Sequence, residues 1–371
     1  MKSLKIVQLL PDLHGGGVER GTLEVAKGLV DAGHTSLVIS TGGRMVKQLE
    51  MEGSQHITWD LGKKSLFTLR HVWAFRRWLA HEKPDILHVR SRMPAWVAWL
   101  AWRGMPENTR PRFITTVHGL YSVSPYSEIM CKGERVIAVS NTVWGYIRDN
   151  YPKTDMNKVT VIHRGIDPAE FPHGYLPSDT WMTEWKQTYP QLEGKKILTL
   201  PGRLTRLKGH HDFIDLINSL KEQNLTVHGL IVGGEDPKRQ AYAQELYARV
   251  KALGLENDIT FTGNRSDMRE IYAISDVVLS LSKKPESFGR TVLEAISIGT
   301  PVVGYDHGGV GEILGELFPE GRISSDTQCL DAKIIELLSE NLRPEKVDRF
   351  SLSMMLDKTF QLYQKVVLSS G

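Results

Sequence analysis

Cysteines and long hydrophobic runs are scarce in this sequence. Only two of its 371 residues are cysteine, Cys131 and Cys329, which indicates neither a disulfide framework nor a cysteine metal site and fits a reducing compartment. No apolar stretch approaches the ~20 residues of a membrane-spanning helix, and the opening run LKIVQLLP is too short for a signal peptide and predicts a buried strand. Low-complexity tracts and solenoid repeats are also missing. These absences favour a globular protein of the cytoplasm.

Two common phosphate-binding fingerprints are missing as well. A glycine-rich turn at 15–17 precedes a predicted helix, whose N-terminal amides favour anions, but Arg20 stands where G-x-G-x-x-G needs its last glycine. No acidic residue ends the second predicted strand to hold a ribose, and G-x-x-x-x-G-K-[ST] does not occur. A NAD-dependent oxidoreductase is therefore disfavoured. The alternative to a ligand-binding role for residues 15–17 is a plain tight turn between strand and helix. No Asp-x-Asp occurs, so no metal site is predicted.

What the chain does contain is an alternation of strands and helices. Runs rich in Val, Ile and Leu between helices argue for parallel, doubly wound sheets. Predicted strands cover 5–11, 34–41, 57–61, 84–90, 112–119, 135–140 and 159–166, then 195–202, 225–234, 257–263, 276–282 and 300–306. Predicted helices cover 18–32, 44–52, 65–82, 93–103 and 141–149, then 209–223, 236–253, 267–274, 289–298, 308–316 and an amphipathic tail at 343–370.

A break in this pattern predicts two domains. The stretch 168–192 holds four prolines and reads as a linker plus the first helix of the second half. We therefore predict an α/β protein with a Rossmann-like domain over 1–168 and another over 169–345, and a C-terminal helix within 346–371 that crosses back to the first domain. Ligands bind at the carboxyl ends of strands in such sheets, so a cleft between two of them is the expected site.

The stretch SKKPESFGRTVLEAISIGTPVVGYD, residues 282–306, carries the strongest functional pattern. Gly289 permits a tight approach, and a helix that begins there offers unpaired N–H groups to a phosphate. Glu286 can reach the hydroxyls of a sugar, and Glu294, about one turn into a largely apolar helix, can accept from a ribose diol. A buried glutamate is costly unless it is paired. The alternative is a capping carboxylate and an exposed helix glutamate.

A basic loop offers a second pattern. Arg203, Arg206 and Lys208 lie between a predicted strand end and a predicted helix. Cations at the ligand end of a sheet suit a diphosphate, although three cations in six residues also fit a solvated loop.

Taken together, these segments resemble the retaining glycosyltransferases of the GT-B fold, specifically glycosyltransferase family 4. The matching residues are GGGVER at 15–20, HG at 118–119, GRLTRLKG at 202–209, FTG at 261–263 and the E-x7-E pair Glu286 and Glu294. They cover essentially the whole chain in the family's order, and the combination is far more specific than E-x7-E alone. The resemblance implies two Rossmann-like domains that face a cleft and a nucleotide-diphosphate sugar as donor.

The resemblance also implies roles for matching residues. The residues expected to act in catalysis are Glu286 at the donor sugar, His118 near the acceptor or transferred sugar, and Arg203 and Lys208 at the diphosphate. The residues expected to bind the donor are Gly16, Gly17, Arg203, Lys208, Asn264, Arg265, Phe288, Gly289, Arg290, Thr291 and Glu294. Among them, the backbone at 264–265 would read the base, amides at 288–291 would hold sugar and phosphate, and Glu294 would bind the ribose. A lone histidine at a strand end is also commonly structural, which is the alternative for His118.

The same resemblance sets expectations for the chemistry. The family retains anomeric configuration, and Arg203 and Lys208 would take the place of a metal. No cofactor is expected beyond the sugar nucleotide, for which uridine is favoured and guanosine is second. The sugar stays open among glucose, N-acetylglucosamine, mannose, galactose and heptose. A sugar-nucleotide epimerase of the same fold and a non-catalytic nucleotide-sugar-binding protein are the alternatives.

The segment 63–112 is basic and aromatic. It holds 11 Lys and Arg against three Asp and Glu, together with Trp73, Trp78, Trp96, Trp99 and Trp102. Tryptophans among cations suit an anionic membrane surface, whereas the alternative is a helix packed through its tryptophans. Nucleic acid is disfavoured, because no known module is visible and residues 166–371 carry 23 basic against 29 acidic residues.

The stretch LHVRSRMPAWVAWLAWR at 87–103, with ITTVHG at 114–119 and ERVIAVS at 134–140, resembles bacterial family members that build lipopolysaccharide core or related surface glycans. The expected acceptor is therefore a lipid-linked or lipopolysaccharide-type glycan, at the inner face of the cytoplasmic membrane. Arg90 and Arg92 follow the strand residues ILHV at 86–89, which places them at the ligand end of the first sheet, where they could contact a phosphorylated acceptor.

Overall fold

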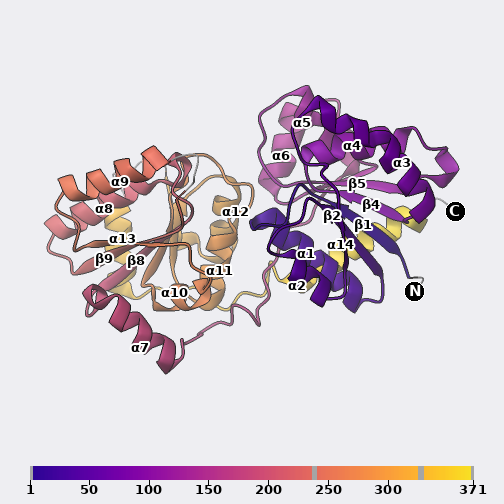
Figure 1. Cartoon of the computed structure of the whole chain (residues 1–371). Helices are drawn as coiled ribbons and strands as arrows, with labels where there is room; N and C mark the ends of the chain where they lie inside the picture. Colours follow the sequence, from indigo (N-terminus) through magenta and orange to yellow (C-terminus); the bar gives the residue numbers. More distant parts are fainter. Residues whose placement is uncertain (1–2, 236–239, 325–329, 369–371) are drawn as a thin grey trace. The chain divides into compact units, whose positions relative to one another are not determined.

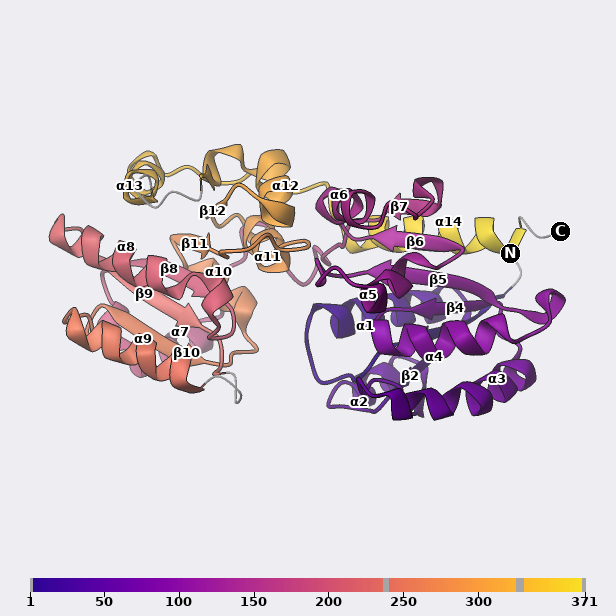
Figure 2. The same cartoon turned by 90° about the horizontal axis from the view of Figure 1, so that it is seen from above.

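The structure is a computed structural model that describes residues 3–235, 240–324 and 330–368 (Figures 1 and 2). Cys329 and the first four residues of the helix predicted at 236–253 lie outside the described residues. The chain divides into two compact units. Unit 1 runs to Gly165 and resumes at Leu352, and unit 2 is Ile166–Ser351. The predicted domain boundaries stand at 168/169 and 345/346, a few residues from these divisions.

Unit 1 is built on a parallel sheet of seven strands in the order β3-β2-β1-β4-β5-β6-β7. The strands are β1 Lys5–Leu9, β2 Thr35–Ser40, β3 Gln55–Thr58, β4 Ile86–Val89, β5 Arg112–Val117, β6 Arg135–Ala138 and β7 Val159–Val161. The helices are α1 Gly17–Asp31, α2 Val46–Met51, α3 His71–Glu82, α4 Arg92–Arg103, α5 Pro125–Glu128, α6 Asn141–Asn150 and α14 Leu352–Leu368. Short 3-10 turns are η1 Leu66–Arg70, η2 Glu107–Thr109, η3 Ile129–Cys131 and η4 Met156–Lys158.

Both faces of this sheet are covered, because its strands are apolar on both sides. Side chains alternate between faces along a strand. In β1, Val7 and Leu9 pack with α3, α4 and α6, whereas Ile6 packs with α1 and α14. Figure 1 shows α14, in yellow, beside α1 beneath the sheet. Such two-sided burial is typical of parallel sheets.

Unit 2 repeats the plan with six parallel strands in the order β10-β9-β8-β11-β12-β13. They are β8 Lys196–Pro201, β9 Val227–Val232, β10 Ile259–Gly263, β11 Val277–Ser280, β12 Val302–Tyr305 and β13 Arg322–Ile323. Its helices are α7 Asp179–Thr188, α8 His210–Glu222, α9 Gln240–Ala252, α10 Met268–Ile274, α11 Arg290–Ile298, α12 Gly308–Leu317 and α13 Leu330–Glu340. Its 3-10 turns are η5 Pro190–Leu192, η6 Arg206–Lys208 and η7 Pro319–Gly321.

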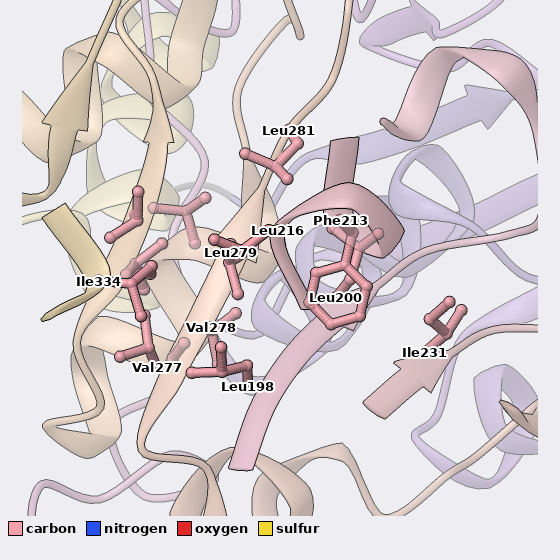
Figure 3. Close-up of a cluster of buried hydrophobic side chains, with 14 of the residues drawn as sticks. Leu198, Leu200, Phe213, Leu216, Ile231, Val277, Val278, Leu279, Leu281 and Ile334 are labelled. Atoms are coloured by element: carbon pink, nitrogen blue, oxygen red, sulfur yellow. The ribbon is translucent and has the colours of Figure 1, made fainter. Parts of the chain in front are cut away.

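The core of unit 2 again lies on both faces of the sheet. Figure 3 shows Leu198 and Leu200 of β8 packed with Phe213 of α8 and with side chains of β11. On the opposite face, Leu230 and Val232 of β9 pack with the helices α7 and α10. Two parallel α/β units of this kind confirm the predicted fold class.

Two predicted elements need correction, and two further elements were missed. The third strand is Gln55–Thr58, not 57–61, and β13 and α13 are not among the predicted elements. The first part of the tail predicted as helix is also wrong, because α14 begins only at Leu352. The residues just before it are not helical: Phe350 has a left-handed backbone (φ +56°), Ile166 N–H donates to the Phe350 carbonyl at 3.0 Å, and Ile166 and Ser351 form a parallel bridge. That pairing takes the backbone groups a helix would need.

Candidate active site

In unit 2, the loop after β8 is built around a lysine. Gly202 has φ +143°, and a Cβ on it would lie 3.2 Å from Cδ of Lys208, so the lysine stem packs over bare backbone. Gly209, with a left-handed backbone (φ +74°), follows η6 and caps the start of α8. Lys208 is thereby held at the carboxyl edge of the sheet, where parallel α/β folds bind ligands.

Lys208 meets Glu286 of the loop after β11. Lys208 Nζ and Glu286 Oε1 are 2.6 Å apart, and the Ser282 hydroxyl donates to the same oxygen. Burial acts to raise the pKa of Glu286, but the charge and hydrogen bond of Lys208, the Ser282 hydroxyl and the nearby His307 outweigh it and hold that pKa below its usual range. Glu286 is therefore an ionised, pre-oriented hydrogen-bond acceptor at neutral pH.

The next helix, α11, is preceded by its N-cap residue Gly289, which has φ +95°. A Cβ there would lie 3.0 Å from Cγ2 of Val310 in α12. The loop before it is fixed to the start of α12, because Gly309 N–H donates to the Glu286 carbonyl at 2.8 Å, and Phe288 is buried. Thr291 is the second residue of α11. The start of α11 and Glu286 are thus held at one edge of unit 2.

Glu294 is a buried glutamate with partners on both oxygens. It is 6% exposed. Arg290 Nε donates to its Oε1 at 2.9 Å, and the Tyr272 hydroxyl donates to its Oε2 at 3.2 Å. This pairing excludes the alternative of an exposed helix glutamate. It also gives Arg290 a side-chain contact in addition to the backbone role predicted for it.

The side chains after β10 hold loops together. Asn264 Oδ1 accepts from Gly234 N–H at 3.0 Å, and Arg265 pairs with Asp267 at 2.6 Å. Their side chains are therefore occupied, which leaves their backbone for the predicted contact. Arg203 is exposed on the loop after β8, at the same edge. Arg206 instead pairs with Glu245 of α9 and is a surface tie.

In unit 1, one arginine joins two of the predicted positions. His118 follows β5, and its Nδ1 lies 2.6 Å from Nη2 of Arg164. The same guanidinium donates to the carbonyl of Gly17 at the start of α1, where a Cβ would lie 2.7 Å from Arg164 Nη1. Gly16 precedes Gly17 with φ +153°. Sequence reasoning missed Arg164, whose only signal is its place three residues after β7.

His118 is neutral. Burial, followed by the charges of Arg164 and Arg90 and the neighbouring His88, holds its pKa well below the usual value. Because a guanidinium can only donate, Nδ1 of His118 must accept, and the proton of the neutral ring is on Nε2.

The basic, aromatic segment 63–112 divides into two parts. Trp78, Trp96, Trp99 and Trp102 pack against the core of unit 1, as the packed-helix alternative expects. Trp73 is 64% exposed, and Leu66 and Phe67 of η1 are also largely exposed. Arg77 lies over the ring of Trp73, and Arg70 lies over the ring of Phe67. Over the described residues no helix is long and apolar enough to span a membrane. Nor do three His, Cys, Asp or Glu side chains gather as metal ligands in that part of the chain.

Two family models match the chain. Residues 15–170 match the model described as Glycosyltransferase Family 4, and residues 182–351 match Glycosyl transferases group 1. A crystal structure of a glycosyltransferase from Rickettsia africae ESF-5 is 31% identical with a TM-score of 0.87, and the match covers 100% of both chains.

Two further similarities are more distant. The structure of Anabaena Alr3699/HepE in complex with UDP-glucose is 20% identical with a TM-score of 0.81, over 98% of this chain and 100% of that one, which supports the fold. N-acetyl-alpha-D-glucosaminyl L-malate synthase of Bacillus anthracis is 28% identical over 281 residues, which are 72% of this chain and 69% of that protein.

Proposed function

The chain belongs to the glycosyltransferases of the family 4 type, and from that premise we propose that it moves a hexose-type sugar from a nucleotide-diphosphate sugar to a glycan acceptor, with retention of anomeric configuration. The observation that carries the proposal is the Lys208–Glu286 pair beside the start of α11. Both family models are of transferases, so the epimerase and the non-catalytic alternatives are not favoured.

The proposed chemistry follows from the charges at this edge of unit 2. Negative charge develops on the leaving diphosphate as the sugar bond breaks, and fixed cations and helix N-termini stabilise it. Lys208 and Arg203 supply the cations and the amides at 288–291 the helix start, so the mechanism we propose uses no metal and no cofactor. Glu286 would accept hydrogen bonds from hydroxyls of the sugar, and Glu294 would accept hydrogen bonds from hydroxyls of the ribose. His118 would donate from Nε2 to the acceptor or the transferred sugar.

Nucleotide binding tests this proposal directly. We expect UDP, among UDP, GDP, ADP and NAD⁺, to raise the melting temperature of the full chain. A ligand at ~100 times its Kd stabilises by roughly 2.7 kcal/mol, which a thermal-shift titration detects. The UDP-glucose held by the Anabaena structure supports uridine as the base. Stabilisation by GDP alone would keep the transferase and change the base, whereas stabilisation by NAD⁺ alone, or by none of the four, would contradict the proposed site.

We further propose that the acceptor is lipid-linked or of the lipopolysaccharide type, and that the protein is peripheral to the inner face of the cytoplasmic membrane. The exposed part of segment 63–112 supports this. Leu66, Phe67 and Trp73 offer apolar contact, and Arg70 and Arg77 offer charge to anionic lipid.

Vesicle binding tests the membrane contact. The double variant Phe67→Ser/Trp73→Ser should weaken binding to phosphatidylglycerol vesicles by roughly tenfold or more, since burying one large apolar side chain contributes about 1.5–3 kcal/mol. Leu176→Ser is the matched control, because Leu176 is at least as exposed but lies in unit 2. Equal loss in both variants, or no binding by the parent protein, would refute this membrane surface.

A further inference from the structure

Unit 1 contains a small cavity at the carboxyl edge of its sheet. Its volume is about 30 Å³, and all of its lining residues belong to unit 1. Arg90 follows β4, His118 follows β5 and Arg164 lies three residues beyond β7, so these three side chains come from strand ends. The other polar lining is His88 of β4, Thr116 of β5 and Thr359 of α14. Val25 of α1 and Met355 of α14 contribute apolar wall. Strand ends of this kind are where parallel α/β sheets bind ligands.

The cavity carries an unusual amount of buried positive charge. Arg90 is 4% exposed and Arg164 is 8% exposed. Arg90 Nε donates to the neutral Gln8 Oε1 at 2.7 Å, and Glu24 is the carboxylate whose charge acts on Arg90. Glu24 also lies 3.6 Å from Arg20, so it is shared. Burying a guanidinium is costly unless an anion compensates it, so this cavity favours a negative ligand.

Arg90 hydrogen-bonds to Gln8 and to the Tyr363 hydroxyl, but two nitrogen atoms in this lining have no partner among the described residues. One is Nη2 of Arg90, and the other is Nε2 of His118, a side chain that is 9% exposed. The contact with Arg164 places the proton of neutral His118 on Nε2, so this atom is a donor. Buried donors of this kind are rare in folded proteins and commonly mark a ligand or ordered water.

The size of the cavity selects the class of anion. One water needs roughly 10–15 Å³ on the same measure, so 30 Å³ holds about two oxygen-sized atoms. A carboxylate has two oxygens, which matches the two unpartnered donors. A phosphate group has four oxygens and is too large for this volume.

We propose that Arg90 Nη2 and His118 Nε2 bind a single carboxylate group, and that the acceptor supplies it. This inference rests on the proposed transferase function and narrows its acceptor to a molecule that bears a carboxylate, such as an acidic sugar. The remaining alternative is a cavity filled by two waters alone.

Acetate is the probe that tests the pocket. In the full chain labelled with ¹⁵N-histidine, acetate added at constant ionic strength should shift the His118 side-chain signal in a saturable way. Arg90→Gln should lower acetate affinity at least tenfold, while Arg135→Gln, an arginine at the opposite end of the same sheet, should leave it unchanged. Val25→Ile keeps every charge and adds one methylene at the cavity wall, so it should also weaken acetate binding. This variant tests the pocket even if Arg90→Gln does not fold.

Three outcomes would overturn the proposal. Absence of any saturable shift would leave only water in the cavity. Tighter binding of inorganic phosphate than of acetate would exclude a carboxylate site. Competition between acetate and UDP would assign the pocket to the donor and not to the acceptor. Because UDP binding is measured separately, stabilisation by UDP without an acetate response would reject the pocket and keep the proposed transferase.

Discussion

Replacing Lys208 with alanine should reduce turnover by roughly 10²-fold or more, the cost of losing one preorganised electrostatic group. Lys208 is packed over Gly202 and paired with Glu286 at 2.6 Å, so its charge is already in place before the donor arrives. The variant loses that charge and leaves the Glu286 carboxylate without its cation. Steady-state kcat and KM for sugar transfer measure the effect, and most of it should fall on kcat if Lys208 acts on the leaving diphosphate.

Lys284→Ala is the matched control for this prediction. Lys284 is exposed on the loop that carries Glu286, two residues before it. It therefore contributes a similar charge without the ion pair that holds Lys208 in place. Near-parental turnover in the control and a large loss at Lys208 would assign the effect to position. Near-parental turnover in Lys208→Ala would remove Lys208 from the proposed mechanism.

The pair can also be separated into its members. Glu286→Gln removes the carboxylate charge but keeps a side chain of similar shape. If Lys208 and Glu286 work as a unit, the double variant should lose much less than the product of the two single losses, since contacting residues are not additive. Fully multiplicative losses would mean that the two residues serve separate functions.

The fold was predictable because both sheets are buried on two faces. Long apolar runs such as those around β1 and β9 occur where helices cover both sides of a parallel sheet. The need to pair Glu294 was predictable for a related reason: an apolar helix cannot bury a lone carboxylate. The identity of its partners was only partly open to inference, because Arg290 lies four residues away on the same helix and Tyr272 comes from another.

The polar cavity of unit 1 was predicted only in part, because sequence reasoning named Arg90 and His118 as separate candidates and missed Arg164. Its three key groups come from positions 90, 118 and 164, and the order of strands alone brings them to one edge. Local sequence indicates which side chains stand at strand ends, but not which strands are neighbours. The same limit applies to the tryptophans of segment 63–112. The composition of the segment does not distinguish Trp73, which is exposed, from Trp99, which packs against the core.

Replacing Gly209 with alanine should destabilise unit 2 by roughly 2–5 kcal/mol. An alanine with left-handed backbone costs roughly 1–2 kcal/mol, and overpacking a filled site typically costs about 1–3 kcal/mol more. Gly209 has φ +74°, and a Cβ on it would lie 2.0 Å from the carbonyl oxygen of Leu281. That carbonyl follows β11, and Lys283 N–H donates to the Leu207 carbonyl at 2.8 Å, so neither strand end can move without breaking the contact between the two loops.

Gly254→Ala separates the two costs, because Gly254 has φ +62° and a Cβ on it would meet nothing within 4 Å. Urea unfolding measures the free energy of unfolding of both variants. Gly254→Ala should lose only the cost of the left-handed backbone, whereas Gly209→Ala should lose that cost plus the cost of overpacking against Leu281. Since Gly209 directly follows Lys208, the variant at 209 should also weaken UDP binding, while the variant at 254 should not. Equal stability losses would mean that the Leu281 loop yields freely, and the loop could then not be what holds Lys208 against Glu286.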